Sequence, residues 1–158
     1  TGTSSDFDAF DDDYTQLFAW DRPTERVVGA YRLTDVAEAT RTAGVKGLYT
    51  RQLFDYDRRF LDALGPAVEL GRSWVMPEYQ KHSSVLFLLW RAVGTYLAER
   101  TDARVLLGAV TISPTYSEAA GSFLRTFLLR HHAATNLAGL VAPLRPPLDS
   151  TGEPATPA

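Results

Sequence analysis

Glu69 is the residue whose setting points most directly to chemistry. It stands between Val68 and Leu70 in an apolar run of strand length. A carboxylate is costly in such a strand unless it is paired or functional. Its neighbour Arg72 offers the structural alternative, a salt bridge that would hold Glu69 without any reaction, and both interpretations stay open at this stage.

Other charged residues suggest ligand binding. Arg32 and Arg72 each carry a guanidinium fork, which binds carboxylates through two parallel hydrogen bonds, although both could instead be solvated surface residues. Asp8 and Asp11 could hold a substrate ammonium group. The alternative is that they belong to a solvated acidic loop near the chain end.

A helix start supplies the third candidate. Gln80-Lys81-His82-Ser83-Ser84 precedes apolar positions that recur with a helical period. Free backbone N–H groups and the helix dipole would attract a phosphate there, and Lys81 would add charge. Almost any helix start has this potential, so an ordinary capped helix is the alternative.

Composition narrows the function classes. The 158 residues are 45% hydrophobic and 22% charged, which suits a single domain. A formal net charge of −3 argues against sequence-independent nucleic-acid binding. The three histidines lack a metal-ligand spacing and there is no cysteine, so we expect no metal site. The absence of cysteine also fits a reducing compartment, and we expect a cytoplasmic location. No apolar run reaches the roughly 20 residues of a membrane span. Because the chain begins at Thr1, we expect it to be an excerpt of a longer product.

The elements that position these residues follow from periodicity and turn chemistry. We expect a β-hairpin from 14–20 and 26–33, short helices near 35–42 and 57–64, and a strand at 67–76. A long helix should bury positions 85, 86, 88, 89, 92, 93, 96 and 97. A strand at 104–112 and a helix capped by Thr115 and Glu118 should follow. This order predicts a mixed α/β or α+β sheet domain over residues 1–142, with a Pro-rich linker or tail at 143–158.

Several motifs in this chain resemble one family. They are Gly29-Ala30-Tyr31-Arg32-Leu33, Leu48-Tyr49-Thr50, Glu69-Leu70-Gly71-Arg72-Ser73, Pro77-Glu78-Tyr79-Gln80 and Leu88-Leu89-Trp90. They look like the ornithine-acyl carrier protein N-acyltransferases, often labelled hemolysin-like, of the GNAT superfamily, and more distantly like the acyl-homoserine lactone synthases. The resemblance runs from about Asp6 to about His132. It implies the GNAT fold, with the family's first helix lying before Thr1 and the last strands absent.

The resemblance also implies a reaction. A 3-hydroxylated fatty acyl group would pass from acyl carrier protein to the α-amine of ornithine or a similar amino acid, giving a lyso-lipid. Glu69 would help to deprotonate the amine, and Arg32, Arg72, Asp8 and Asp11 would bind the amino acid. The expected phosphopantetheine-binding residues are Val75, Met76, Gln80, Lys81, His82, Ser83 and Ser84. No cofactor would be bound, because the acyl-phosphopantetheine thioester, carried by acyl carrier protein or coenzyme A, is a co-substrate.

Two departures and two rivals qualify this interpretation. Trp74 and Met76 stand where smaller or more polar residues are expected, and residues 80–84 lack a glycine-rich pyrophosphate loop. One rival is a GNAT enzyme with another amine acceptor, such as glycine or a polyamine. The other is a non-catalytic acyl-binding domain fused to a lysophospholipid acyltransferase, and the resemblance leaves room for peripheral contact with the inner membrane.

The geometry of the strand gives a structural prediction. Residues three apart on a regular strand point to opposite faces, so Glu69 and Arg72 can share a site only if a β-bulge lies between them. GNAT enzymes, which this chain resembles, splay two neighbouring parallel strands at such a bulge to admit the pantetheine arm. The resemblance therefore implies an irregularity within residues 70–75, with Gly71 tolerating its backbone angles, and a cleft beyond it between this strand and Val105–Ile112. Trp20, Trp74 and Trp90 are expected to belong to the core rather than to an acyl tunnel.

Overall fold

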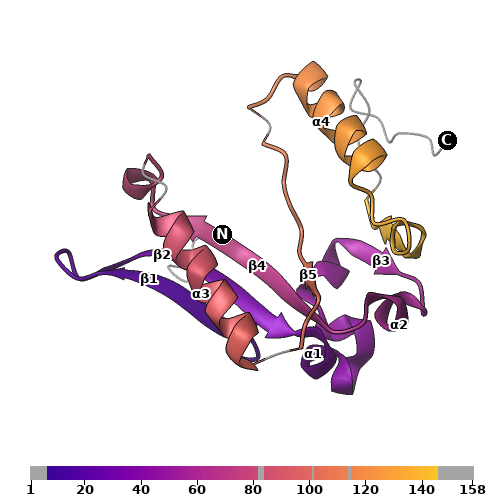
Figure 1. Ribbon diagram of the computed structural model, residues 1–158, viewed down its shortest axis with the longest axis horizontal. Coiled ribbons are helices and arrows are strands. Elements are labelled where there is room, and N and C mark those ends of the chain that lie inside the picture. Colours follow the sequence, from indigo (N-terminus) through magenta and orange to yellow (C-terminus); the bar gives the residue numbers. More distant parts are fainter. Residues whose placement is uncertain (1–6, 82–83, 101, 114, 146–158) are drawn as a thin grey trace. The chain divides into compact units, whose positions relative to one another are not determined.

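The computed structural model describes residues 7–81, 84–100, 102–113 and 115–145 (Figure 1). The chain forms two compact units that alternate along the sequence. The first comprises Thr1–Tyr49 and Gly65–Gly108, and the second comprises Thr50–Leu64 and Ala109–Ala158. The described residues among those that the sequence singles out for chemistry all lie in the first unit.

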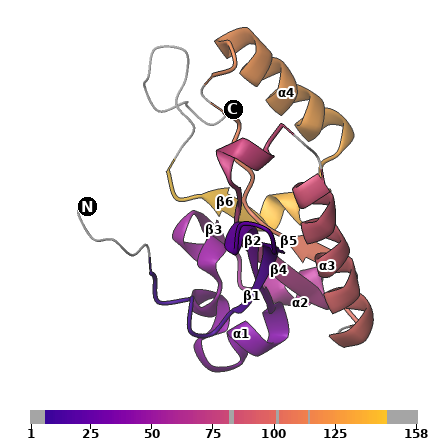
Figure 2. The same cartoon turned by 90° about the vertical axis from the view of Figure 1, so that its left-hand side faces the viewer.

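A four-stranded sheet in the order β1-β2-β4-β5 forms the centre of the first unit. Its strands are β1 (Thr15–Asp21), β2 (Arg26–Asp35), β4 (Ala67–Val75) and β5 (Val105–Leu107). The first three pair antiparallel, whereas β4 and β5 pair parallel. Helix α3 (Ser84–Arg100) packs along β1 and β2 (Figures 1 and 2). This mixed sheet with flanking helices confirms the expected α/β fold class and is consistent with a GNAT fold.

The N-terminal half of the sheet forms as the sequence predicts. The β1–β2 hairpin turns over residues 22–25, where Pro23 presets one backbone angle and Glu25 adopts a left-handed φ of 52°. Helix α1 (Val36–Ala43) then begins at Asp35, whose side chain accepts a hydrogen bond from the Glu38 N–H. It ends at Gly44, which has a φ of 58°, and the 3₁₀ turn η1 (Gly44–Gly47) follows.

The core of this unit lies between α3 and the sheet. One cluster contains Val28, Val85 and Leu89, and a second contains Leu33, Val68 and Val93. The predicted buried face of α3 is too broad, because Leu86 and Leu88 are 46% and 52% exposed. This helix is apolar on nearly all sides, so its periodicity could not show which positions face the sheet.

The three tryptophans do not belong to the core. Trp20, Trp74 and Trp90 are 51%, 46% and 46% exposed, which corrects the expectation that they are buried. Trp20 lies near the end of the outermost strand, and Trp90 packs one edge of its ring on Tyr31 at 5.9 Å between centroids. Trp74 pairs with Ala30 and lines a cavity together with Leu86 and Leu89 of α3. Size and aromaticity alone did not distinguish these positions from core positions.

Strand β5 is shorter than the predicted 104–112. Its pairing with β4 joins Ala67 to Val105 and ends where Glu69 meets Leu107. At the next residue, Gly108, an added Cβ would lie 2.8 Å from the Leu70 carbonyl oxygen, so only glycine fits there without a shift. Strand β4 is irregular just beyond this point, and a bulge interrupts the ladder that a longer β5 would need.

The second unit contains a two-stranded sheet that the sequence did not predict. Strand β3 (Phe54–Tyr56) pairs antiparallel with β6 (Val141–Pro143). The unit also holds α2 (Phe60–Leu64), shorter than the predicted 57–64, the 3₁₀ turn Ala138–Leu140, and α4 (Glu118–His131). The N-cap of α4 is Ser117 rather than the predicted Thr115, because the Ser117 hydroxyl accepts from the Ala120 N–H. Most of the predicted tail, residues 146–158, lies outside the described residues, so the domain boundary stays a prediction.

Candidate functional site

A β-bulge in β4 brings the candidate residues to one side of the sheet. Trp74 pairs with Ala30, but Gly71 pairs with Arg32, so β4 contains one more residue than β2 between these pairs. Arg72 itself takes the left-handed backbone conformation, with a φ of 44°. The predicted irregularity within residues 70–75 is therefore confirmed, although it uses Arg72 and not Gly71 as the left-handed residue.

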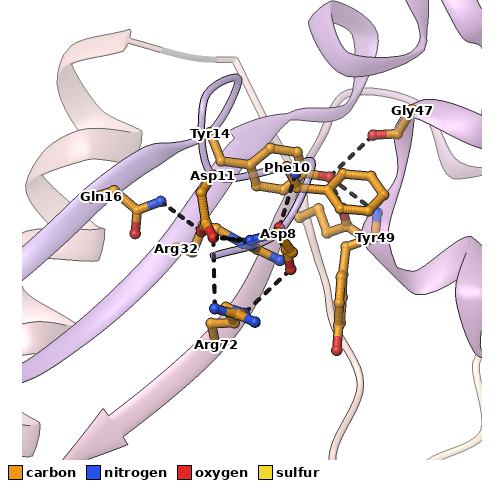
Figure 3. A network of polar contacts seen from close by, with 10 residues as sticks. Asp8, Phe10, Asp11, Tyr14, Gln16, Arg32, Gly47, Tyr49 and Arg72 are labelled. Carbon is orange, nitrogen blue, oxygen red and sulfur yellow. Dashed lines mark hydrogen bonds and ion pairs between the residues drawn. The ribbon is translucent and has the colours of Figure 1, made fainter. Parts of the chain in front are cut away.

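The acidic segment before β1 is an ordered turn. The Asp8 carbonyl accepts from the Asp11 N–H at 3.2 Å, and the Asp8 and Asp11 carboxylates accept from the backbone N–H groups of Phe10 and Asp8 at 2.8 Å. These bonds form an Asx-type turn, a motif in which short acidic side chains replace backbone partners. The turn aims both carboxylates at the sheet (Figure 3).

Arg32 and Arg72 both pair with these two carboxylates. One terminal nitrogen of Arg32, Nη1, lies 2.7 Å from Asp8 Oδ1 and 2.7 Å from Asp11 Oδ1. Arg72 approaches the same carboxylates from β4, with Nε 3.3 Å from Asp8 and Nη1 3.6 Å from Asp11. The four residues that the sequence singled out separately thus form one ionic cluster (Figure 3).

Besides its two carboxylate partners, Arg32 is surrounded by aromatic rings. Its side chain is fully buried, and its guanidinium carbon lies 5.0–5.8 Å from the ring centroids of Phe10, Tyr14 and Tyr49. Cation–π attraction and the two carboxylates stabilise the charge there. Its Nε and Nη2 are buried without a hydrogen-bond partner among the described residues. The role of Arg32 in gripping a substrate carboxylate stays a prediction.

The pKa values of the two aspartates reflect this pairing. Burial alone would raise the pKa of Asp8, but hydrogen bonds from Arg32 and the Phe10 N–H, with the charges of Arg32 and Arg72, lower it overall. The pKa of Asp11 is also lowered, first by the Asp8 N–H and then, against a smaller effect of burial, by Arg32 and Arg72. Both carboxylates are therefore charged at neutral pH.

Glu69 is fully buried and hydrogen-bonded. Its Oε2 accepts a short hydrogen bond from the Tyr14 hydroxyl and a second bond of 3.0 Å from the Tyr49 N–H. The Tyr14 oxygen also lies 3.1 Å from the Tyr49 nitrogen and 3.2 Å from the Gly47 carbonyl oxygen. Burial and the adjacent Glu69 carboxylate raise the pKa of Tyr14 well above its usual range. Tyr14 therefore stays protonated and can donate to Glu69.

Sequence reasoning missed Tyr14 and Tyr49 as parts of this site. Tyr14 was interpreted as the first apolar residue of a hairpin strand, and Tyr49 entered only through a family motif. A buried tyrosine needs a partner for its hydroxyl, which is the one signal that could have linked Tyr14 to a buried carboxylate. Tyr14 and Glu69 lie 55 residues apart in the sequence, so no local pattern could show that they form a hydrogen bond.

The predicted phosphopantetheine-binding residues do not all play the same part. Val75 and Gln80 line a cavity of about 260 Å³ beside the bulge, together with Ser73 and Trp74. Met76 packs against the core, and its N–H donates to the Val28 carbonyl. Lys81 lies in an exposed turn and Ser84 begins α3. His82 and Ser83 lie outside the described residues, and binding by the whole set stays a prediction.

Two larger cavities flank the sheet of the first unit. One, of about 450 Å³, is lined by Tyr14 and Gly47 and bordered by charged side chains of α1 and η1. The other, of about 420 Å³, is mainly apolar and lies between β1, β2 and α3. Among the described residues, no group of three or more histidine, cysteine or acidic side chains is arranged to hold a metal ion. In the same part of the chain, no helix is long and apolar enough to cross a membrane.

Known proteins similar to this chain agree with this architecture. Residues 1–91 match the acetyltransferase (GNAT) domain family. A protein of Bacteroides thetaiotaomicron named glycine N(alpha)-acyltransferase is 31% identical over 166 residues, covering 97% of this chain and 48% of that protein. A protein of Phocaeicola vulgatus with the same name is 30% identical over 158 residues, covering 92% of this chain and 48% of that protein. The chain thus spans about half the length of these curated relatives.

Proposed function

The chain belongs to the acetyltransferase (GNAT) domain family, and on this basis we propose that it forms part of an N-acyltransferase. The enzyme moves an acyl group from a phosphopantetheine thioester to the α-amine of a small amino acid. The names of the two relatives support glycine as the acceptor. The motifs around Glu69-Leu70-Gly71-Arg72-Ser73 resemble those of enzymes that use ornithine and acyl carrier protein. Ornithine is therefore the second acceptor to be tested, and acyl carrier protein is the donor to be tested.

The bulge in β4 is the observation that carries this proposal. It places Arg72 on the same side as Glu69, so that a buried carboxylate and an ionic cluster face one region of the first unit. The parallel pairing with β5 ends at Glu69, while β4 continues to Val75. A thioester arm that lies along this part of β4 would bring its carbonyl carbon close to Glu69, which takes the proton of the amine, and to Arg72.

The chemistry that this arrangement must perform is simple. An amino acid arrives as an ammonium ion, which has no lone pair, so a proton must leave before nitrogen attacks the thioester carbon. Glu69 takes that proton as a general base, a role that typically contributes roughly 10²–10⁴-fold to the rate. The carbon–nitrogen bond then forms, the carbon–sulfur bond breaks, and backbone N–H groups stabilise the intermediate oxyanion.

A product assay on the full-length protein tests the proposal. Acyl carrier protein and coenzyme A thioesters of the same acyl chain are each incubated with glycine, ornithine, other amino acids and a polyamine, and products are identified by mass spectrometry. We expect an N-acyl amino acid. Binding of the thioester without any amide product would support the non-catalytic acyl-binding alternative instead.

Glu69→Gln separates catalysis from folding in the same assay. We expect turnover to fall about a hundredfold while thioester binding is retained, because glutamine keeps the shape but cannot accept the proton. Glu78→Gln is the matched control, since Glu78 is an exposed carboxylate in the turn after β4. Activity of Glu69→Gln within a few-fold of the control would remove Glu69 from the mechanism.

A further inference from the structure

The cavity of about 450 Å³ beside Tyr14 has the size and charge of a small-ligand site. Its volume falls within the range of roughly 300–1,000 Å³ that is usual for ligand pockets. Arg41 and Lys46 provide two positive charges on its border, and Asp13 and Glu38 provide two negative charges. A free amino acid carries a carboxylate and an ammonium group, so it matches both halves of this charge pattern.

Glu69 needs an intermediary to reach any ligand in this cavity. Its side chain is fully buried, and it is not among the residues that line the cavity. Tyr14 both lines the cavity and donates its hydroxyl hydrogen to Glu69. Gly47, whose carbonyl oxygen lies 3.2 Å from the Tyr14 hydroxyl, also lines the cavity.

We propose that this cavity binds the acceptor amino acid and that Tyr14 relays the proton of its ammonium group to Glu69. The inference rests on the proposed function and adds the acceptor site and a residue that the sequence did not single out. The Tyr14 oxygen takes one proton from the ammonium nitrogen while its own proton passes to Glu69 Oε2. The products of this step are a neutral amine, an intact tyrosine and a protonated Glu69, so protons and charge balance.

The hydrogen bonds around Tyr14 suit both states of the relay. Before the transfer, the Tyr14 O–H donates to the Glu69 carboxylate. After it, protonated Glu69 can donate to the Tyr14 oxygen while the Tyr14 O–H turns to the Gly47 carbonyl. The hydroxyl has only one hydrogen, so it cannot satisfy Glu69 and Gly47 together, and the presence of both acceptors provides the two orientations.

Tyr14→Phe tests the relay in the full-length protein. Phenylalanine keeps the ring beside the Arg32 guanidinium and removes only the hydroxyl. With the acceptor identified by the product assay, we expect kcat to fall about a hundredfold, with an unchanged KM for the thioester. Near-ultraviolet circular dichroism checks that the variant is folded under the assay conditions.

The pH profile distinguishes a relay from a structural role. Without the relay, only acceptor molecules that are already neutral can attack, so the Tyr14→Phe rate should rise about tenfold per pH unit below the pKa of the amine. The wild-type rate should be nearly flat over the same range. The charged groups around Tyr14 are common to both proteins, and they are Asp13, Arg32 on β2, Glu38 and Arg41 on α1, Lys46 on η1, and Glu69 on β4. Parallel profiles for the two proteins would overturn the relay.

Lys46→Gln tests the cavity as the acceptor site. We expect a KM for the amino acid that is about tenfold higher, because one charge that faces the carboxylate is lost, with an unchanged KM for the thioester. Arg22→Gln, which removes an exposed charge in the β1–β2 turn, is the matched control. An unchanged KM for the amino acid in an active Lys46→Gln protein would overturn this site, whereas a wild-type protein that forms no amide would refute the proposed function itself.

Discussion

Arg32 connects the N-terminal turn to the sheet, and its partners could not be recognised from sequence. Asp8 and Asp11 lie 24 and 21 residues before it, yet both contact the same terminal nitrogen. The sequence indicated which side chains could bind a carboxylate or an ammonium group. It could not show that these side chains bind one another, because that pairing depends on how the turn packs on β2.

Arg32→Met should be strongly destabilising. The substitution leaves the partly buried carboxylates of Asp8 and Asp11 without their main cation, and removing one member of a buried ion pair typically costs about 3–5 kcal/mol. We expect the lower end of this range, since Arg72 still contacts both carboxylates. Chemical denaturation measures the loss, and Arg26→Met, at an exposed position on the same strand, is the control.

Acid titration gives an independent check on the same cluster. The pKa values of Asp8 and Asp11 in the folded protein lie below the ordinary value of 3.8. Their contribution to stability is therefore present above that value and is lost as the pH falls through the folded-state pKa values. This loss should be smaller in Arg32→Met than in Arg26→Met. Equal acid sensitivity in the two variants would show that Arg32 does not set these pKa values.

At the level of elements, β4 shows both what sequence patterns predict and where they stop. The apolar run from Ala67 predicted the strand, and the three-residue spacing of Glu69 and Arg72, together with the resemblance to GNAT enzymes, predicted its bulge. The residue that absorbs the strain was not predictable, because the choice between Gly71 and Arg72 depends on the register with β2. Likewise, the apolar run after Arg104 predicted a longer β5, since composition cannot show where a parallel partner ceases to pair.

A pair of substitutions at Arg72 measures the strain in this bulge. Arg72→Gly and Arg72→Ala both remove the contacts to Asp8 and Asp11, but only glycine adopts a φ of 44° without steric cost. We expect Arg72→Ala to be about 1–2 kcal/mol less stable than Arg72→Gly in chemical denaturation. Equal stabilities would mean that the bulge relaxes when the ion pairs are lost.

At the scale of the whole molecule, the two units share one chain that passes between them more than once. Residues 50–64, which precede β4 in the sequence, belong to the second unit. The chain then re-enters the first unit at Gly65 and passes to the second unit again after Gly108. The proposed site uses only residues of the first unit. The second unit is held by contacts between distant segments, including β3 with β6 and the bonds of Asp57 N–H to Leu140 O and of Leu144 N–H to Leu53 O.

This arrangement predicts that local stability follows the units and not the order of the sequence. A chain shortened to end at Ala138 loses β6 and both of those bonds, so the amides of Phe54 to Asp57 should exchange with solvent about tenfold faster or more. The amides of β4 from Val68 to Gly71 are close in sequence but pair with β2 and β5, so their exchange should be unchanged. Hydrogen exchange followed by mass spectrometry measures both segments in one experiment. If the β4 amides accelerated together with those of β3, the two units would have to unfold as one cooperative body, and the site around Glu69 would depend on the second unit for its stability.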